Sequence, residues 1–201
     1  VDVYTAFQDS VDGTPPVNPC NPSMSTLDFH PNQHGHDLIA KAINNKLPAK
    51  TYSLSVSGTT VTSQNANDVL DDGGTVRYDA APNTLKLNNA KIDYASDSAV
   101  FYYSSNPDFT IELSGKNYVS SSVNDYETIS AYSADLVLQG SGSLEISSTK
   151  SSCIFANSVH ITSGTYTFDP ASGQWDVYAA DTIEITGSDT VITTGTNSVF
   201  G

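Results

Sequence analysis

His30, His34 and His36 lie within seven residues of one another near the start of the chain, and Asp28 stands two residues before the first of them. An imidazole can take a proton from a weak nucleophile such as a serine hydroxyl, or it can ligate a metal ion. The segment lacks the carboxylate geometry that would support a metal site. General-base chemistry is therefore the favoured interpretation, and metal binding is the alternative.

The segment 28–40 reads D-x-H-P-N-x-x-G-H-x-x-I-A. It resembles the last conserved block of SGNH (GDSL-type) esterases, which carries the catalytic histidine near the C-terminal end of the catalytic domain. The resemblance implies that His30 is the catalytic base and that Asp28 orients its ring. The family's acidic residue stands three positions before the histidine, where this chain has Leu27. A backbone carbonyl could therefore orient His30 in place of Asp28.

The nucleophile that His30 would serve is missing from this sequence. No Gly-Asp-Ser occurs, and Ser10 and Ser98 each follow an aspartate that lacks the preceding glycine. By the resemblance, the serine and the oxyanion-hole blocks belong upstream of position 1. We therefore expect the end of a longer esterase, inactive by itself. The alternative is a coincidental loop and helix.

Short elements would position this block. Residues 1–4 read as a buried strand, and a proline-rich loop follows them. Apolar residues then recur at helical spacing before Pro48, at Leu38, Ile39, Ala42 and Ile43. Residues 1–50 are therefore expected to form a small α/β remnant of an SGNH domain.

From residue 51 onward the sequence consists of short strand-like repeats. Apolar-x-apolar triplets recur about every 23 to 26 residues, at 85–87, 111–113, 136–138, 159–161 and 183–185. A second set follows them, as at 143–146 and 165–168, and a third precedes them at 100–102, 129–131, 154–156, 177–179 and 199–201. Three short strands per period of about 24 residues are typical of a parallel three-sided β-helix. A β-sandwich would not predict this constant order.

The start of this region resembles the carbohydrate-binding right-handed β-helix modules of clostridial and related surface proteins. The matching runs are 61–69, 74–79 and 83–90. The resemblance implies polysaccharide binding at a cell surface. The repeat at 199–201 opens a further coil, so the module over 51–201 is expected to be truncated at its C-terminal end.

Aromatic residues recur at one position of the third set of strands. If the preceding valines and isoleucines point inward, strand alternation points the aromatics outward, with Ser130 as a gap in their column. The predicted ligand-binding side chains are Phe101, Phe155, Tyr178, Phe200 and Trp175, with Tyr102, Tyr103 and Tyr132 as neighbours. In the reversed register, the aromatics would form the core.

The chain of 201 residues has a formal net charge of −14. This charge argues against nucleic acid and anionic membranes as partners, and no apolar run is long enough for membrane insertion. Acidic turns such as 68–72 make calcium possible, although no cofactor is required. Arg77 is the sole arginine, which disfavours a pectate-lyase-like mechanism. Cys20 and Cys153 are expected to be two unrelated thiols.

These observations predict a fragment of a carbohydrate-active SGNH esterase whose β-helix binds polysaccharide or a cell-wall glycan. The composition suits a secreted or cell-surface protein of a Gram-positive bacterium. The alternative is a non-catalytic adhesin or structural solenoid, and an enzymatic β-helix is a third interpretation.

Overall fold

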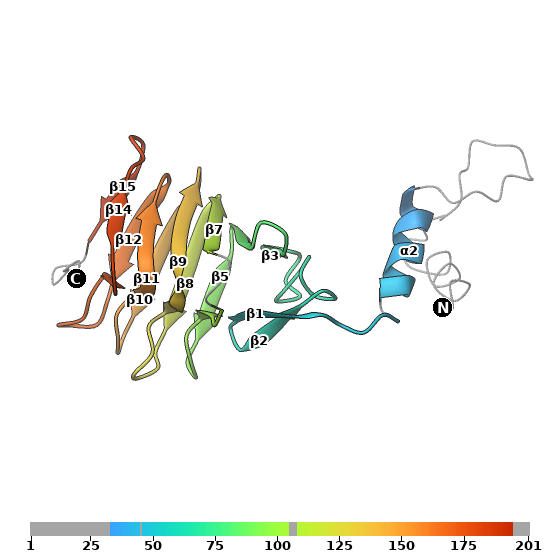
Figure 1. Cartoon of the computed structure of the whole chain (residues 1–201), viewed down its shortest axis with the longest axis horizontal. Helices are drawn as coiled ribbons and strands as arrows, with labels where there is room; N and C mark the ends of the chain where they lie inside the picture. Colours follow the sequence, from blue (N-terminus) through green and yellow to red (C-terminus); the bar gives the residue numbers. More distant parts are fainter. Residues whose placement is uncertain (1–32, 45, 105–107, 195–201) are drawn as a thin grey trace, which may run out of the picture. The chain divides into compact units, whose positions relative to one another are not determined.

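The computed structural model describes residues 33–44, 46–104 and 108–194, and the chain divides into two compact units at Lys50 and Thr51. The first unit contains helix α2 (Gln33–Asn44), and the strands of the described residues all lie in the second (Figure 1). Residues 1–32 lie outside the described part, and with them the predicted first strand, Asp28 and His30. Helix α2 confirms the predicted helix, and the SGNH assignment of this unit stays a prediction.

Helix α2 is amphipathic. Leu38 and Ile39 are half-buried, and Gln33 donates a hydrogen bond to Asp37 one turn along the helix, with 2.9 Å between Nε2 and Oδ1. The helix ends before Pro48, where the backbone N–H groups of residues 46 and 47 both bond to the carbonyl of Ile43. It is too short and too polar to cross a membrane, and no described helix could do so.

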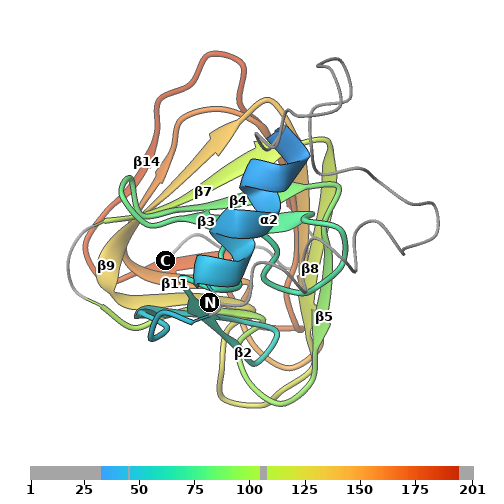
Figure 2. The ribbon, with the colours of Figure 1, turned by 90° about the vertical axis from the view of Figure 1, so that its right-hand side faces the viewer.

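The second unit is a three-sided parallel β-solenoid of about four coils. Side one consists of β6 (Val100–Tyr102), β13 (Val177–Ala179) and the first halves of β9 (Ile129–Gly140) and β11 (Ile154–Ile161). Side two consists of β4 (Thr84–Asn88), β7 (Phe109–Ser114), β14 (Ile183–Ile185) and the second halves of β9 and β11. Side three consists of β5 (Lys91–Tyr94), β8 (Lys116–Ser121), β10 (Ser143–Ser148), β12 (Thr165–Asp169) and β15 (Val191–Thr193). Figure 2 looks along the direction in which the coils stack, so that successive coils nearly overlap in the picture.

Strands β9 and β11 each turn a corner and contribute to two sides. Strand β9 pairs with β6 through Ile129 and Ser130, and with β7 from Leu136 to Gly140. The sequence repeats predicted two separate strands at each of these places. The structure joins them with a register irregularity at the bend, where three residues of β9 between Ala131 and Asp135 stand against one residue of β11 between Ala156 and Ser158.

Antiparallel strands cover the first coil. Strands β1 (Thr51–Val56) and β2 (Thr59–Thr62) form a hairpin, and β1 pairs with β6. Ser57 and Gly58 have φ of 48° and 74°, as a tight two-residue hairpin turn requires. Strand β3 (Val76–Asp79) covers β4 in the same way. These strands occupy backbone groups that would otherwise form an open sheet edge.

The coil register follows the predicted triplets at every step except one. Ile111 lies opposite Leu138, whereas aligning the triplets would place it opposite Leu136. The shift is two residues, so inward side chains stay inward. It brings Gly140 opposite Leu113, where an added Cβ would lie 2.2 Å from the Leu113 carbonyl oxygen. Gly140 therefore permits this register.

The solenoid core is a continuous column of valine, leucine and isoleucine side chains with a few aromatic rings. Cys153 is a fully buried free thiol, and its sulfur lies 3.3 Å from the carbonyl oxygen of Ile146. Burial raises the pKa of this thiol to about 12. Cys153 is therefore an inert core residue.

Candidate functional site

The outer surface of side one carries a row of aromatic side chains. Val100, Ile154 and Val177 point inward and have no exposed surface. The residues that follow them, Phe101, Phe155 and Tyr178, lie on the outer side and are half-buried or exposed. The structure thus adopts the predicted register, and the ligand-binding role of these residues stays a prediction. Phe200 lies outside the described residues.

Tyr132 closes the gap that Ser130 was predicted to leave. Ser130 pairs with Phe101 on one side and Phe155 on the other, and it is fully buried. Tyr132 stands two residues later on the same outer face. Its ring centroid lies 6.5 Å from that of Phe101 and 4.5 Å from that of Phe155. The aromatic surface therefore continues without interruption from the first coil to the third.

Ring contacts extend this surface at both ends. The centroid of Tyr178 lies 5.2 Å from that of Phe155 and 6.1 Å from that of Trp175. At the other end, the centroids of Phe101 and Tyr103 lie 5.7 Å apart. We call this set the aromatic row, and its members are Phe101, Tyr103, Tyr132, Phe155, Trp175 and Tyr178. It crosses the strands and follows the direction in which the coils stack.

Tyr102 does not belong to the row, although sequence proximity suggested that it would reinforce it. It is 2% exposed, and its ring stacks on Phe109 in the core at 4.6 Å between centroids. The reason is strand alternation, which turns Tyr102 inward between Phe101 and Tyr103.

The members of the row differ in exposure. Tyr103, Tyr132, Tyr178 and Trp175 are 50%, 43%, 40% and 36% exposed, whereas the two phenylalanines are only partly accessible. The ring centroids of Tyr132 and Phe155, and those of Phe155 and Tyr178, are too close for the rings to lie flat side by side. The two rings of the first pair are tilted by 44° to each other, and those of the second pair by 32°. The phenylalanines therefore support the row from below, and the tyrosines and Trp175 present ring surface and polar groups to solvent.

Two tyrosine hydroxyls in the row have defined partners. Tyr103 donates to the carbonyl oxygen of Tyr52 at 3.0 Å, and Tyr132 donates to Glu127 Oε2 at 3.1 Å. Partial burial, followed by the charge of Glu127, raises the pKa of Tyr132. Its hydroxyl therefore stays protonated at neutral pH. The row can offer a ligand both apolar ring surface and hydrogen-bonding oxygens.

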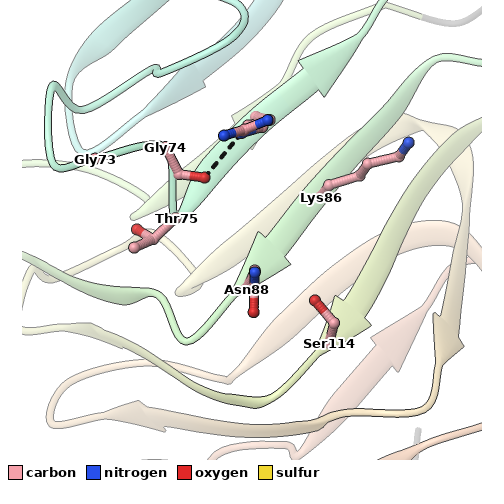
Figure 3. A pocket seen from close by; sticks show the side chains of 7 residues that line it. Gly73, Gly74, Thr75, Lys86, Asn88 and Ser114 are labelled. Atoms are coloured by element: carbon pink, nitrogen blue, oxygen red, sulfur yellow. Dashed lines mark hydrogen bonds between the residues drawn. The ribbon is translucent and has the colours of Figure 1, made fainter.

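A second feature is a polar hollow of about 320 Å³ on side two (Figure 3). Its lining comes from the turn before β3, from β3 itself and from strands β4 and β7: Gly73, Gly74, Thr75, Arg77, Lys86, Asn88 and Ser114. Arg77 Nε donates to the Gly74 carbonyl oxygen at 3.0 Å, and Lys86 Nζ lies 2.5 Å from Asp79. The bond to Asp79 raises the pKa of Lys86. Both cations of the hollow are therefore already engaged within the protein.

The acidic turn beside this hollow uses its carboxylates to hold its own backbone. Asp68 accepts hydrogen bonds from the N–H groups of Asp72 and Gly73 at 3.0 and 3.3 Å, and the first of these bonds is the main cause of its lowered pKa. Asp72 accepts from the N–H of Thr75 at 3.1 Å. Among the described residues, no group of three or more His, Cys, Asp or Glu side chains is placed to hold a metal ion.

The sequence signals for the two features differ in strength. Tyr132 could have been placed in the row, because it follows Ser130 by two residues in the same strand. The hollow has no local signal, because its lining residues come from positions between 73 and 114 and meet only through strand pairing.

The chain was compared with family models, with curated proteins and with solved structures. The searches of curated proteins and of solved structures found no match. The model of a family described as "carbohydrate-binding domain-containing protein" matches residues 49–199, which cover the whole described solenoid and most of the chain. The chain therefore belongs to the family of carbohydrate-binding domain-containing proteins.

Proposed function

We propose that the solenoid binds polysaccharide through the aromatic row on side one. The observation that carries the proposal is the unbroken run of ring contacts over successive coils, in a chain whose family is a carbohydrate-binding one. Sugar rings have apolar C–H surfaces and polar hydroxyl rims. Exposed aromatic rings with nearby hydroxyl and carboxylate groups complement both.

The row suits a glycan better than the hollow does. The described residues that line the hollow include no aromatic side chain on which a sugar ring could stack, and Arg77 and Lys86 among them already bond to Gly74 and Asp79. Trp175 and Tyr178 present ring surface, because they are 36% and 40% exposed. The net charge of −14 also favours a neutral glycan over a strongly anionic one.

Retention on insoluble polysaccharides tests this proposal. The panel is cellulose, chitin, xylan, mannan and cross-linked pectin, each mixed with the purified chain and centrifuged. We expect retention on at least one of them, and a loss of roughly tenfold or more in affinity for the Trp175→Ala and Tyr178→Ala variants. Tyr118→Ala is the control, because Tyr118 lies on the outer surface of side three.

The outcome separates binding from a structural role. Wild-type protein that stays in the supernatant with every polysaccharide would favour the adhesin or structural-solenoid interpretation. Retention that survives both row variants would place the binding surface elsewhere on the solenoid.

We further propose that the parent protein is a secreted or cell-surface SGNH esterase that this module holds on its glycan. The support is the sequence block around His30, together with helix α2 at the position where the block predicts a helix. In the parent protein, His30→Ala should abolish hydrolysis of p-nitrophenyl acetate, whereas His34→Ala should leave most of it. A parent sequence without a Gly-Asp-Ser nucleophile would refute this part of the proposal.

A further inference from the structure

We infer that the ligand is a linear polysaccharide whose chain lies along the solenoid axis and crosses the coils, and that Tyr132 joins the two halves of its binding surface. The inference rests on the proposed function and specifies the class of glycan: extended chains of several sugars, as opposed to single sugars. It follows from the register of side one and the contacts of Tyr132.

The row is long in one direction only. Phe155 and Tyr178 are Cα partners on adjacent coils, and Phe101 and Phe155 flank Ser130 two coils apart. Adjacent coils are separated by about 4.8 Å, the spacing of paired strands. The rings of Phe101, Tyr132, Phe155 and Tyr178 therefore extend over roughly three strand spacings, about 14 Å.

Across the strands the row is narrow at its centre. Along strand β9, Tyr132 is preceded on the outer face by the fully buried Ser130 and is followed by the exposed Ser133 and the core residue Ala134. None of these neighbours offers an aromatic ring to a ligand that runs parallel to the strand. A ligand that runs along the axis meets a ring at each step.

The spacing of the rings also selects the ligand. In an extended polysaccharide, successive pyranose rings advance by a distance close to the separation of paired strands. Such a chain can place consecutive sugars over consecutive coils without bending. A compact or branched glycan would match the row at one or two positions only.

Tyr132 is the residue on which this continuity depends. Without its ring, Phe101 and Tyr103 would be separated from the other half of the row by two strand spacings, roughly 10 Å. The serine beneath cannot replace it, because Ser130 has no exposed surface. Removal of Tyr132 should therefore divide one long site into two short ones.

A chain-length series tests the inference. A polysaccharide that retains the wild-type protein is partly hydrolysed, separated by size, and titrated against wild type, Tyr132→Ala and Tyr132→Phe. For wild type we expect affinity to rise with length up to about four sugars, one for each coil that the row crosses, and then to level off. Tyr132→Ala should bind the long fragments roughly tenfold more weakly and the disaccharide almost unchanged. Tyr132→Phe keeps the ring and loses only the bond to Glu127, so it should stay within about threefold of wild type.

The results distinguish the inference from the function on which it rests. If row variants abolish retention but affinity does not depend on chain length, the axial arrangement is wrong and polysaccharide binding stands. An equal loss for Tyr132→Ala with fragments of every length would also overturn the inference. If no polysaccharide retains the wild type, both proposals fall. Thermal unfolding of each variant checks that a loss of binding is not a loss of fold.

Discussion

At the scale of single residues, the same residue type serves different purposes according to the direction in which it points. Tyr102 is a core residue and its neighbour Tyr103 is half exposed, although they are adjacent in the chain. Asn83 is a further example. It is 2% exposed, accepts from the Tyr78 hydroxyl at 2.5 Å, and donates to the Tyr102 hydroxyl and the Asp108 carbonyl at 2.9 and 2.7 Å. This amide links strand β3 to the first coil.

Replacing Asn83 by alanine should lower the free energy of unfolding by about 2 to 4 kcal/mol, because the buried hydroxyls of Tyr78 and Tyr102 would each lose a partner and the Asp108 carbonyl would lose a donor. Asn89 is the matched control. Both asparagines have positive φ, 51° and 55°, but Asn89 is exposed. Asn89→Ala should therefore cost only about 1 to 2 kcal/mol, from backbone strain and from the loss of the exposed hydrogen bond that Asn89 Oδ1 accepts from the Lys116 N–H at 3.1 Å. Urea denaturation measures both, and equal losses would contradict a structural role for the buried network.

At the scale of elements, the solenoid depends on close approach between successive coils. Gly140 has φ of 117°, and a Cβ there would lie 2.2 Å from a backbone oxygen of the preceding coil. Backbone atoms cannot move aside as the end of a flexible side chain can. The two-residue shift between the second and third coils therefore requires glycine at this position.

Gly140→Ala should destabilise the protein by more than about 3 kcal/mol, because backbone strain and a clash add together. Gly173→Ala is its control: Gly173 has φ of 78°, and a Cβ there would meet nothing within 4 Å. We expect that variant to lose about 1 to 2 kcal/mol. Should Gly140→Ala prove too unstable to purify, soluble yield beside Gly173→Ala gives the comparison. Similar stabilities for the two would refute the register assigned here.

The sequence repeats predicted the three-sided solenoid and the outward register of Phe101, Phe155 and Tyr178, because inward valine and isoleucine alternate with them. They did not predict the shift at Gly140, since aligning Ile111 with Leu136 or Leu138 satisfies the same alternation. The hollow could not be predicted, because Arg77 and Lys86 meet only after β3 and β4 pair. Local patterns determine which face a side chain occupies, and pairing between coils determines its neighbours.

At the scale of the whole molecule, several ionisable groups are kept neutral in the solenoid core. Burial raises the pKa of Cys153 from 9.0 to about 12, raises that of Tyr78 from 10.0 to about 12, and raises that of Tyr166 as well. Each folded pKa lies above its unfolded value. Their contribution to stability is therefore complete below pH 9 and is lost as the pH rises toward 12.

The melting temperature should accordingly fall steeply between pH 9 and pH 12. Cys153→Ala should fall less over the same range, because the unfolded variant has no thiol at this position to ionise. Thermal unfolding followed by circular dichroism measures both curves. Parallel curves for wild type and variant would show that Cys153 does not contribute to the alkaline loss.

The fluorescence of Trp175 reports whether polysaccharide lies on the aromatic row. Trp175 is the chain's single tryptophan, it is 36% exposed, and it contacts Tyr178 at the end of the row. On titration with a soluble fraction of a polysaccharide that retains the protein, we predict a blue shift of its emission and reduced quenching by acrylamide. Saturating binding with unchanged emission and unchanged quenching would show that the polysaccharide does not lie on the aromatic row.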